Sequence, residues 1–534
     1  MIDLQKLTLG ELILKAAEKY NKKTCFQIFR DNGVYDQINY TEFGVKARQF
    51  AAFLKDRGIK PKDRVMILAE NRPEWPIAYF GIALAGAVCV PVLTDFVEDQ
   101  IRAIADHSEV SAVCASERTA AKAKYASGNS SAPIIMVDDA DLFHEKRIPE
   151  LSEFPETEEN DLAVIIYTSG TTGASKGVSL SHKNLVYTAI ASRFSIKVFP
   201  RDRFLSVIPL AHTYECTLGL LAPVINGASI TYLDRPPSPA ILLPAMQILR
   251  PTAMVSVPLF IEKICRSYIF PKLEAHPLYK SSLTRGIAIQ AAGTQLMAAL
   301  GSSIRCFGIG GAPLAEDVEL FLRKAQFPYS VGYGLTETSP LITGTTPYHF
   351  PFRSTGKTMP GVEIRTSEEG EIQVRGPNVM IGYYRDEERT LEAFTPDGWL
   401  KTGDLGNLDK KANLYIRGRI KALILGPSGE NIYPEEIENI LAKSFLVEEA
   451  LVVPGDRGEL VAFIVLSEKA KTALAALAEN LEELKNSVNR RLAAFSRLNR
   501  IEVRHEPFEK TPTRKIKRFL YSITDSAKAS LPRE

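Results

Sequence analysis

The sequence predicts an α/β protein with a large N-terminal domain of parallel sheets and helices, which includes a small β subdomain, and a small α+β C-terminal domain. Strand-like and helical segments alternate from about residue 60 to residue 340, which is typical of parallel sheets covered by helices. Shorter alternating segments follow from about 354 to 416. A chain of 534 residues is also too long for one ordinary domain.

Short apolar runs predict the buried strands of the large domain. The first 20 residues, in contrast, have the pattern of an amphipathic helix and lack the pattern of a signal peptide. Two longer uncharged runs, 77–93 and 216–233, contain both proline and glycine and are predicted to be buried helices that lead into strands rather than membrane spans. The predicted strands are 64–69, 111–116, 162–167, 229–233 and 304–310.

Short segments with turns, such as "GEIQVRG" and "NLYIRG", predict the β subdomain. After "GRIK" (418–421) the pattern becomes that of a compact α+β unit with a long helix over 472–495. We therefore expect an N-terminal domain of residues 1–418 and a C-terminal domain of residues 419–534.

Composition limits the function classes. The hydrophobic share of 45% and the charged share of 24% are those of a soluble globular protein, and a net charge of +2 gives no sign of nucleic-acid binding. The six cysteines are scattered without a C-x-x-C pair, which argues against zinc and disulfides and fits a reducing, cytoplasmic compartment. The seven histidines form no metal-binding pattern.

"YTSGTTGASKG" (167–177) has the composition of a phosphate-binding loop. Its spacing excludes the P-loop, because Lys176 comes before a glycine instead of after one. Glycines allow backbone N–H groups to surround an anion, hydroxyl residues add donors, and a lysine adds positive charge. A strand precedes the loop and a helix capped by Ser181 follows, so we expect the loop to join a strand to a helix, a common place for anion binding. A flexible loop without a ligand is the alternative reading.

This stretch resembles the signature of the adenylate-forming superfamily, which contains acyl- and aryl-CoA ligases, adenylation domains and firefly-type luciferases. Ser175 stands where the family prefers proline, and the match otherwise continues through Val178 to His182. The resemblance implies that the loop holds ATP and that Thr172 also takes part in catalysis and in Mg²⁺ binding. The implied ATP contacts in the loop are Thr168, Ser169, Gly170, Thr171, Thr172 and Lys176.

Two further motifs extend the resemblance. "IPLAHTYE" (208–215) resembles the family segment that borders the acyl pocket, which implies a catalytic role for His212. On its own this histidine would be read as a side chain at the end of a strand. "GIGGAP" (308–313) resembles the turn that lies against adenine, which implies contacts from Gly310, Gly311 and Ala312.

"GYGLTETSP" (332–340) combines an aromatic ring, a hydroxyl and a carboxylate, groups that can stack on a base, bind phosphate and hold Mg²⁺. It resembles the family's Y-G-x-T-E motif. The resemblance implies that Tyr333 stacks on adenine beside Gly334, that Thr336 contacts phosphate, and that Glu337 is a catalytic metal ligand.

Three sites lie in the last third of the chain. "GWLKTGDLG" (398–406) resembles a family motif whose aspartate, here Asp404, accepts hydrogen bonds from the ribose hydroxyls. "YIRGRIK" (415–421) implies further nucleotide contacts from Ile416 and Arg419 and a domain hinge at Lys421. "EKTPTRKIKR" (509–518) aligns Lys515 with the family's catalytic lysine, with Arg514 in place of a glycine; composition alone would suggest a solvated tail or a basic binding patch.

These motifs occur in the family's order and are spread from residue 167 to residue 518, and "SGENIYPEEIE" (428–438) looks most like long-chain fatty acyl-CoA synthetases. The resemblance implies an AMP-forming ligase that uses ATP, Mg²⁺ and CoA to convert a fatty acid to acyl-AMP and then to acyl-CoA. It also implies that the C-terminal domain rotates between the two steps.

The alternatives are an aryl-CoA ligase, a fatty acyl-AMP ligase that loads a separate carrier protein, a non-catalytic nucleotide or acyl-adenylate binding protein, and a membrane or nucleic-acid binding module built on the basic cluster. Retention of the implied ATP contacts argues against a non-catalytic protein, and the near-neutral net charge argues against the binding module. The motifs leave the acyl chain length, the oligomeric state and any peripheral contact with a membrane open.

Overall fold

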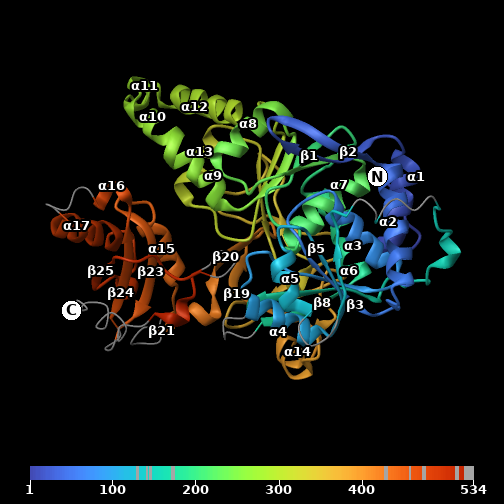
Figure 1. Ribbon diagram of the computed structural model, residues 1–534. Helices are drawn as coiled ribbons and strands as arrows, with labels where there is room; N and C mark the ends of the chain where they lie inside the picture. The colour runs from blue at the N-terminus through green and yellow to red at the C-terminus, as the bar shows by residue number, and fades with distance from the viewer. Residues whose placement is uncertain are drawn as a thin grey trace, which may run out of the picture.

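The computed structural model describes residues 1–534 except 128–131, 140–141, 143–146, 170–174, 426–430, 456–458, 472–476, 511–515 and 522–534. Two large, mainly parallel sheets, a four-stranded sheet and a C-terminal unit make up the described part (Figure 1). This arrangement confirms the predicted α/β class, with a large N-terminal domain and a small C-terminal one.

A nine-stranded sheet has the order β15-β14-β13-β12-β11-β9-β10-β1-β2. The strands from β13 to β1 in this order run parallel, whereas the edge strands are antiparallel. Strand β1 pairs with β10 about two hundred residues away, so the α/β domain begins earlier than residue 60, where the sequence predicts it. The strands are β1 (Thr24–Arg30), β2 (Gly33–Asn39), β9 (Arg203–Leu205), β10 (Ser229–Leu233), β11 (Ala253–Ser256), β12 (Cys306–Ile309), β13 (Tyr329–Tyr333), β14 (Thr343–Gly344) and β15 (Lys357–Thr358).

A seven-stranded sheet has the order β18-β8-β7-β4-β3-β5-β6. Here one prediction is wrong: the glycine-rich loop joins two antiparallel strands, β7 and β8, rather than a strand and a helix. Val178 and Leu180 in β8 are fully buried, so this short alternating segment packs as a strand before the helix begins. Ser181 then caps that helix, as predicted. The strands are β3 (Arg64–Leu68), β4 (Val88–Pro91), β5 (Val110–Ala115), β6 (Ile134–Met136), β7 (Leu162–Ser169), β8 (Ser175–Ser181) and β18 (Gly382–Tyr383).

The two sheets share one layer of helices. Alternate residues of β3 show this, because Val65 and Ile67 pack into the core between the sheets, whereas Met66 and Leu68 pack against α4 and α5 on the outer face. A third core lies between the nine-stranded sheet and helices α8 to α13. The middle layer contains α1 (Leu9–Tyr20), α2 (Tyr40–Asp56), α3 (Glu74–Leu84), α6 (His182–Ala191), the π-helix η5 (Glu215–Leu221) and α7 (Ala222–Asn226). The outer helices are α4 (Glu98–Ser108), α5 (Ala120–Ser127), α8 (Pro239–Leu249), α9 (Pro258–Ile264), the π-helix η6 (Cys265–Ile269), α10 (Phe270–Ala275), α11 (Pro277–Lys280), α12 (Arg285–Ala299) and α13 (Glu316–Lys324).

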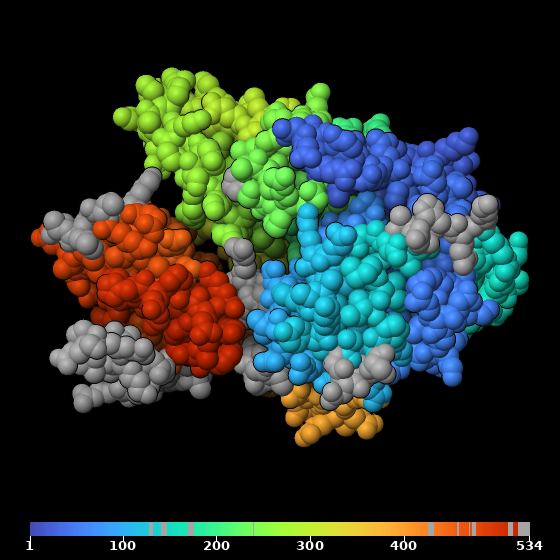
Figure 2. All heavy atoms as spheres, in the orientation of Figure 1, coloured from blue at the N-terminus to red at the C-terminus, as the bar shows by residue number. Residues whose placement is uncertain are grey.

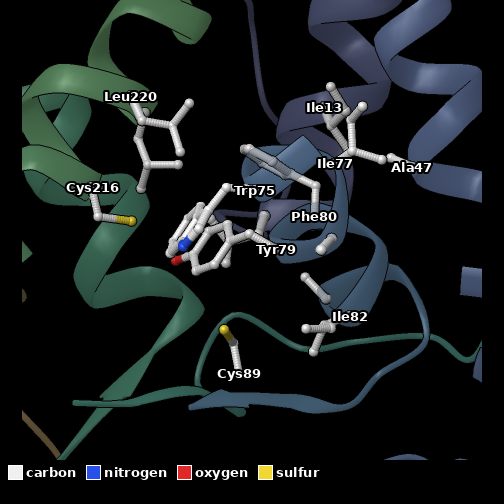
Figure 3. Packing of buried hydrophobic residues seen from close by; sticks show 14 of the residues in the cluster. Ile13, Ala47, Trp75, Ile77, Tyr79, Phe80, Ile82, Cys89, Cys216 and Leu220 are labelled. Carbon is white, nitrogen blue, oxygen red and sulfur yellow. The ribbon is translucent and has the colours of Figure 1, made fainter. Parts of the chain in front are cut away.

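Helix α3 is buried on all sides and lies at the centre of the core. Trp75 and Tyr79 stack with their ring centroids 5.3 Å apart and point from α3 toward Cys216 of η5 and Cys89 of β4 (Figure 3). The runs 77–93 and 216–233 thus form buried helices that lead into strands, as predicted. Among the described residues, no helix has the length and apolarity needed to cross a membrane.

The predicted β subdomain is a four-stranded sheet, β16-β17-β19-β20, with α14 beside it. The C-terminal unit contains a three-stranded sheet packed against α15 and α17. The helix predicted over 472–495 ends earlier, at Asn489, because the Asn489 side chain exchanges two hydrogen bonds with the backbone of Leu498 and turns the chain back. The bounds are β16 (Glu363–Thr366), β17 (Glu371–Arg375), α14 (Glu387–Ala393), β19 (Leu400–Leu408), β20 (Leu414–Arg419), β21 (Ile424–Leu425), β22 (Asn431–Ile432), α15 (Pro434–Leu441), β23 (Val447–Pro454), β24 (Leu460–Leu466), α16 (Glu468–Lys471), α17 (Leu477–Asn489) and β25 (Arg500–Arg504); short 3₁₀ turns are η3 (Leu151–Glu153), η4 (Ser192–Phe194), η7 (Thr336–Thr338), η8 (Ile420–Ala422), η10 (Ala494–Ser496) and η11 (Arg518–Leu520).

Candidate active site

One cleft of about 3620 Å³ is lined by the segments that follow the parallel strands of both large sheets. In open α/β sheets, ligands bind beyond the carboxyl ends of the strands, because loops from neighbouring strands converge there. The cleft receives such segments from β3, β4, β9, β12 and β13, and its other walls come from β19, β20 and the C-terminal unit. Figure 2 shows the hollow between the orange and red C-terminal part and the green and cyan parts.

The β7–β8 hairpin brings two of the predicted phosphate contacts together. Thr168 and Lys176 are directly opposite in the antiparallel register, so their side chains lie on the same face. The Thr168 hydroxyl oxygen is buried and has no hydrogen-bond partner among the described residues, which fits a site prepared for a ligand acceptor. Ser169 is the last residue of β7; Gly170, Thr171 and Thr172 lie outside the described residues.

Lys176 faces Glu337, and a tyrosine joins them. The Lys176 ammonium lies 2.7 Å from the Tyr383 hydroxyl and 3.4 Å from Glu337 Oε1, and the Tyr383 hydroxyl lies 2.9 Å from the same carboxylate oxygen. Because an ammonium can only donate and a carboxylate can only accept, the phenol must accept from Lys176 and donate to Glu337. Burial, followed by the charge of Glu337, raises the pKa of Tyr383 above its usual range, so the phenol keeps the proton it donates.

Tyr383 was not among the residues predicted from the sequence. It reaches the cleft because β18 pairs with β8, which places Tyr383 beside Val178, close to the hairpin residues. Its backbone N–H donates to Thr390 Oγ1 at 2.8 Å, which holds β18 against α14. The only sequence signal is the pair of tyrosines in "GYYR" (382–385), which has the residue types of a strand but no recognisable chemistry.

A second polar group lies on the β subdomain side of the cleft. Asp404 and Arg419 are partners in the β19–β20 register, and Arg419 Nε lies 2.7 Å from Asp404 Oδ1. The Tyr333 hydroxyl donates to Asp404 Oδ2 at 2.8 Å. Asp404 is only 4% exposed, so its negative charge is fixed in position by two donors. Ile416 lines the cleft from the adjacent strand β20.

The glycines that the motifs assign to the ATP site are required at their positions for different structural reasons. Gly310, Gly311 and Ala312 line the cleft after β12, and Gly311 has a φ of +82°, which side-chain-bearing residues rarely adopt. A Cβ on Gly334 would lie 1.8 Å from the Pro340 carbonyl oxygen, so this position must be glycine to allow the tight return of the chain after β13. Thr336 and Glu337 follow in the turn η7 and line the cleft.

His212 lines the cleft, and the backbone N–H of Tyr214 donates to its Nδ1 at 3.2 Å. Glu215, three residues later, points into the core instead and is 1% exposed. Ser206 donates to Glu215 Oε1 at 2.5 Å, and Asn71 donates to Ser206 at 2.9 Å. Burial raises the pKa of Glu215 to about 8, so this carboxyl is largely protonated at neutral pH.

Glu215→Gln is expected to remove a pH dependence of stability. A carboxyl whose pKa is raised from 4.5 in the unfolded chain to about 8 in the folded protein stabilises the fold below pH 4.5 and loses that contribution as pH rises toward 8. The loss between pH 5 and pH 8 amounts to about 3 kcal/mol. Urea unfolding of both proteins at several pH values measures it. Parallel stability curves for wild type and variant would contradict the proposed protonation of Glu215.

Lys421 lies in the turn η8, directly after β20, and lines the cleft where the C-terminal unit begins. Lys515 lies outside the described residues. Several described residues that follow it, among them Lys517 and Arg518, line the same cleft.

Comparison with known families agrees with this arrangement. A family model described as AMP-binding enzyme matches residues 13–384, and a model of the AMP-binding enzyme C-terminal domain matches residues 436–515. The chain belongs to the AMP-binding enzyme family.

Curated AMP-binding enzymes similar to this chain include ligases of long-chain fatty acids. The chain is 30% identical to the long-chain-fatty-acid–CoA ligase FadD15 of Mycobacterium bovis, covering 91% of this chain and 90% of that protein. It is 31% identical to the peroxisomal long chain acyl-CoA synthetase 6 of Arabidopsis thaliana, covering 79% of this chain and 67% of that protein.

Solved AMP-binding enzymes share the fold over nearly the whole chain. ATP-bound MatB from Rhodopseudomonas palustris has a TM-score of 0.78 at 25% identity, covering 96% of this chain and 98% of that one. The o-succinylbenzoate CoA synthetase of Bacillus subtilis, in complex with its acyl-adenylate intermediate, has a TM-score of 0.78 at 25% identity and covers 95% of this chain and 97% of that one.

Proposed function

We propose that this AMP-binding enzyme is an AMP-forming fatty acid–CoA ligase. It would activate a fatty carboxylate with ATP, releasing pyrophosphate, and then transfer the acyl group from acyl-AMP to CoA. The observation that carries the proposal is one cleft that contains both the Lys176–Tyr383–Glu337 cluster and the Asp404–Arg419–Tyr333 cluster. The long-chain relatives support a fatty acid as substrate.

One cluster of residues is suited to bind the ribose and base of ATP, and the other is suited to bind its phosphates. Asp404, fixed by Arg419 and Tyr333, is suited to accept hydrogen bonds from two ribose hydroxyls, and the Gly310–Ala312 turn leaves room for a flat base beside Tyr333. Thr168, Lys176 and Thr336, which line the same cleft, offer donors to the phosphates. Ser169, Gly170, Thr171, Thr172 and Ile416 are assigned to ATP by the sequence motifs.

Glu337, with Thr172, would hold Mg²⁺, since hard oxygen ligands suit this ion. When bound, the ion neutralises charge on the phosphates. The protein's part in adenylation is then to orient the carboxylate for in-line attack on the α-phosphate and to place donors where negative charge develops. No protein nucleophile is needed, because the fatty carboxylate itself attacks. His212 borders the place where that carboxylate would lie.

Apolar side chains in the cleft support a fatty acid as substrate. Five of them come from consecutive helices of the large domain, Leu242 and Leu243 of α8, Phe260 and Ile264 of α9, and Ile269 of η6. A fatty acyl chain can bury more apolar surface against these side chains than an aryl acid can, so the lining favours a fatty acid over an aromatic one.

ATP–pyrophosphate exchange, measured with acids from acetate to long-chain and aromatic ones, tests the substrate class. Exchange that rises with chain length, together with acyl-CoA formation when CoA is added, is the expected result. Exchange with aromatic acids only would identify an aryl-CoA ligase, and acyl-AMP without thioester would identify an enzyme that loads a carrier protein. No exchange with any acid would contradict an enzymatic function.

Glu337→Gln is expected to lower the adenylation rate by about a hundredfold and to weaken its dependence on Mg²⁺, because an amide cannot hold the cation as a carboxylate does. A titration of the exchange rate against Mg²⁺ in both proteins measures this. An unchanged titration curve would remove Glu337 from the metal site.

Tyr383→Phe is expected to weaken Mg²⁺–ATP binding by about tenfold while keeping the fold, since it removes one hydrogen bond to each of two charged groups and leaves the ring in place. Tyr384→Phe is the matched control, because Tyr384 is the next residue and its ring lies against His107 rather than against Lys176. Calorimetric titration with ATP, with and without Mg²⁺, gives the affinities. Equal affinities for the two variants would show that the phenol does not position Lys176 and Glu337.

A further inference from the structure

The segment of residues 377–384, here called the bridging segment, is bonded to both parts of the chain that form the Lys176–Tyr383–Glu337 cluster. Toward strand β8, which carries Lys176, the backbone N–H of Tyr384 donates to the Gly177 carbonyl oxygen at 2.7 Å. Toward the turn η7, which carries Glu337, the backbone N–H of Met380 donates to the Glu337 carbonyl oxygen at 2.9 Å. The bridging segment therefore connects the phosphate hairpin to the metal-binding turn.

A buried asparagine of the bridging segment adds side-chain hydrogen bonds to the same turn. Asn378 is 0% exposed, and its amide nitrogen donates to the carbonyl oxygens of Leu341 at 2.8 Å and Thr338 at 3.3 Å. Because both acceptors are backbone carbonyls, the NH₂ end of the amide must face them. One side chain thus holds the chain at two points directly after Glu337, and removing it would leave buried carbonyls without this donor.

A second asparagine fixes the backbone on both sides of Asn378. The amide nitrogen of Asn184, in the first turn of α6, donates to the Pro377 carbonyl oxygen at 2.8 Å and to the Val379 carbonyl oxygen at 2.9 Å. Its Oδ1 accepts from the backbone N–H of Ser181 at 2.8 Å. With its neighbours held in this way, Asn378 has little freedom to follow a movement of the turn, so the turn is held in place instead.

We propose that Asn378 is a positioning residue for Mg²⁺–ATP, because it sets how far Glu337 stands from Lys176. Asn378 is not among the described residues that line the cleft, so it acts through Glu337. The Lys176 ammonium and Glu337 Oε1 are 3.4 Å apart and attract each other, so a loosened turn would let Glu337 pair with Lys176 instead of with the cation. The role rests on the proposed function, and Mg²⁺ is a sensitive probe of it because this ion demands near-ideal octahedral geometry.

Calorimetric titration with ATP, with and without Mg²⁺, tests the role. The quantity compared is the gain in ATP affinity that Mg²⁺ provides. Asn378→Leu nearly keeps the size of the side chain and removes both hydrogen bonds. It is expected to reduce the gain by about tenfold, while the affinity for ATP without Mg²⁺ changes by less than about threefold.

Asn226→Leu is the matched control. Asn226 is 1% exposed, and its amide nitrogen donates to the Ala222 carbonyl oxygen at 2.8 Å, but it lies in α7, of which no described residue lines the cleft. The same substitution there should lower stability in urea unfolding as well, yet leave the Mg²⁺ gain within about twofold of the wild-type value.

A double-mutant cycle separates positioning from a merely structural role. In the Glu337→Gln background, Asn378→Leu is expected to reduce the Mg²⁺ gain no further, because the carboxylate that it positions is gone. Asn378→Ser, whose hydroxyl can still donate one hydrogen bond, should fall between wild type and Asn378→Leu. If either leucine variant does not fold, Asn378→Ser and Asn226→Ser carry the same comparison.

The proposal is overturned if the folded Asn378 variants keep the wild-type gain, if the Asn226 variants lose as much of it, or if the losses from Asn378→Leu and Glu337→Gln add. Failure of the proposed function gives a different result, since it would be seen in the wild-type protein itself. A wild type that binds no ATP, or whose ATP affinity does not rise with Mg²⁺, would contradict the proposed ATP and metal site and the role of Asn378 with it.

Discussion

Replacing Lys515 with alanine is expected to lower the rate of acyl-adenylate formation by about two to three orders of magnitude, the effect typical of removing one positioned stabiliser of transition-state charge. Negative charge builds up on the α-phosphate when the carboxylate attacks, and a lysine ammonium can stabilise it without transferring a proton. Thioester formation from supplied acyl-AMP should change only severalfold, because Lys515 has no role as a base for the thiol.

Lys517→Ala is the matched control, since Lys517 lies two residues along the same basic segment and forms an exposed ion pair with Glu509 at 3.3 Å. Single-turnover assays of the two half-reactions measure both variants. If Lys515→Ala slowed both half-reactions equally in a folded protein, its role in adenylation would be wrong. If Lys517→Ala alone slowed adenylation, the motif would be aligned in the wrong register.

Much of the fold could be predicted from local patterns. Buried parallel strands are short apolar runs in the sequence, so β3, β5, β7, β10 and β12 were predicted close to their observed positions. Local patterns contain no information on which distant strands pair. The pairing of β1 with β10 therefore could not be predicted, and segment 175–181 could be recognised as a strand only through its burial against β7 and β18.

In the candidate site, too, some residues could be predicted from local sequence patterns, whereas others depend on long-range packing. Asp404, Glu337 and Lys176 lie in segments with distinctive chemistry, and the structure brings all three to one cleft. Tyr383 could not be found, because its role depends on a two-residue strand that pairs with a hairpin two hundred residues earlier. Glu215 is the last residue of the His212 motif "IPLAHTYE", yet its burial and raised pKa depend on how η5 packs against the sheet.

Lys421→Pro is expected to impair the two half-reactions very unequally, with a ratio changed by at least about tenfold. In the proposed mechanism the C-terminal domain must first close over the α-phosphate and then admit CoA to the same acyl-phosphate, and one static arrangement could hardly do both. Lys421 lies in the short turn η8, between the last strand of the β subdomain and the C-terminal unit. Proline fixes φ near −65° and also disfavours the helical conformation of the preceding residue, Ile420.

Contacts between the C-terminal unit and the rest of the chain explain why the Lys421→Pro variant would stay in one domain arrangement. Lys443, two residues after α15, forms an ion pair with Glu316 at the start of α13, so the C-terminal unit contacts α13 in the observed arrangement. A hinge that can no longer rotate would keep this contact and serve only the half-reaction that the arrangement permits. Lys421→Ala, which leaves the backbone free, is the control and should keep both rates within about twofold, whereas Lys443→Ala should shift the ratio of the two rates without abolishing either. Small, equal losses in Lys421→Pro would show that the chain rotates about another residue and that the domain boundary lies elsewhere.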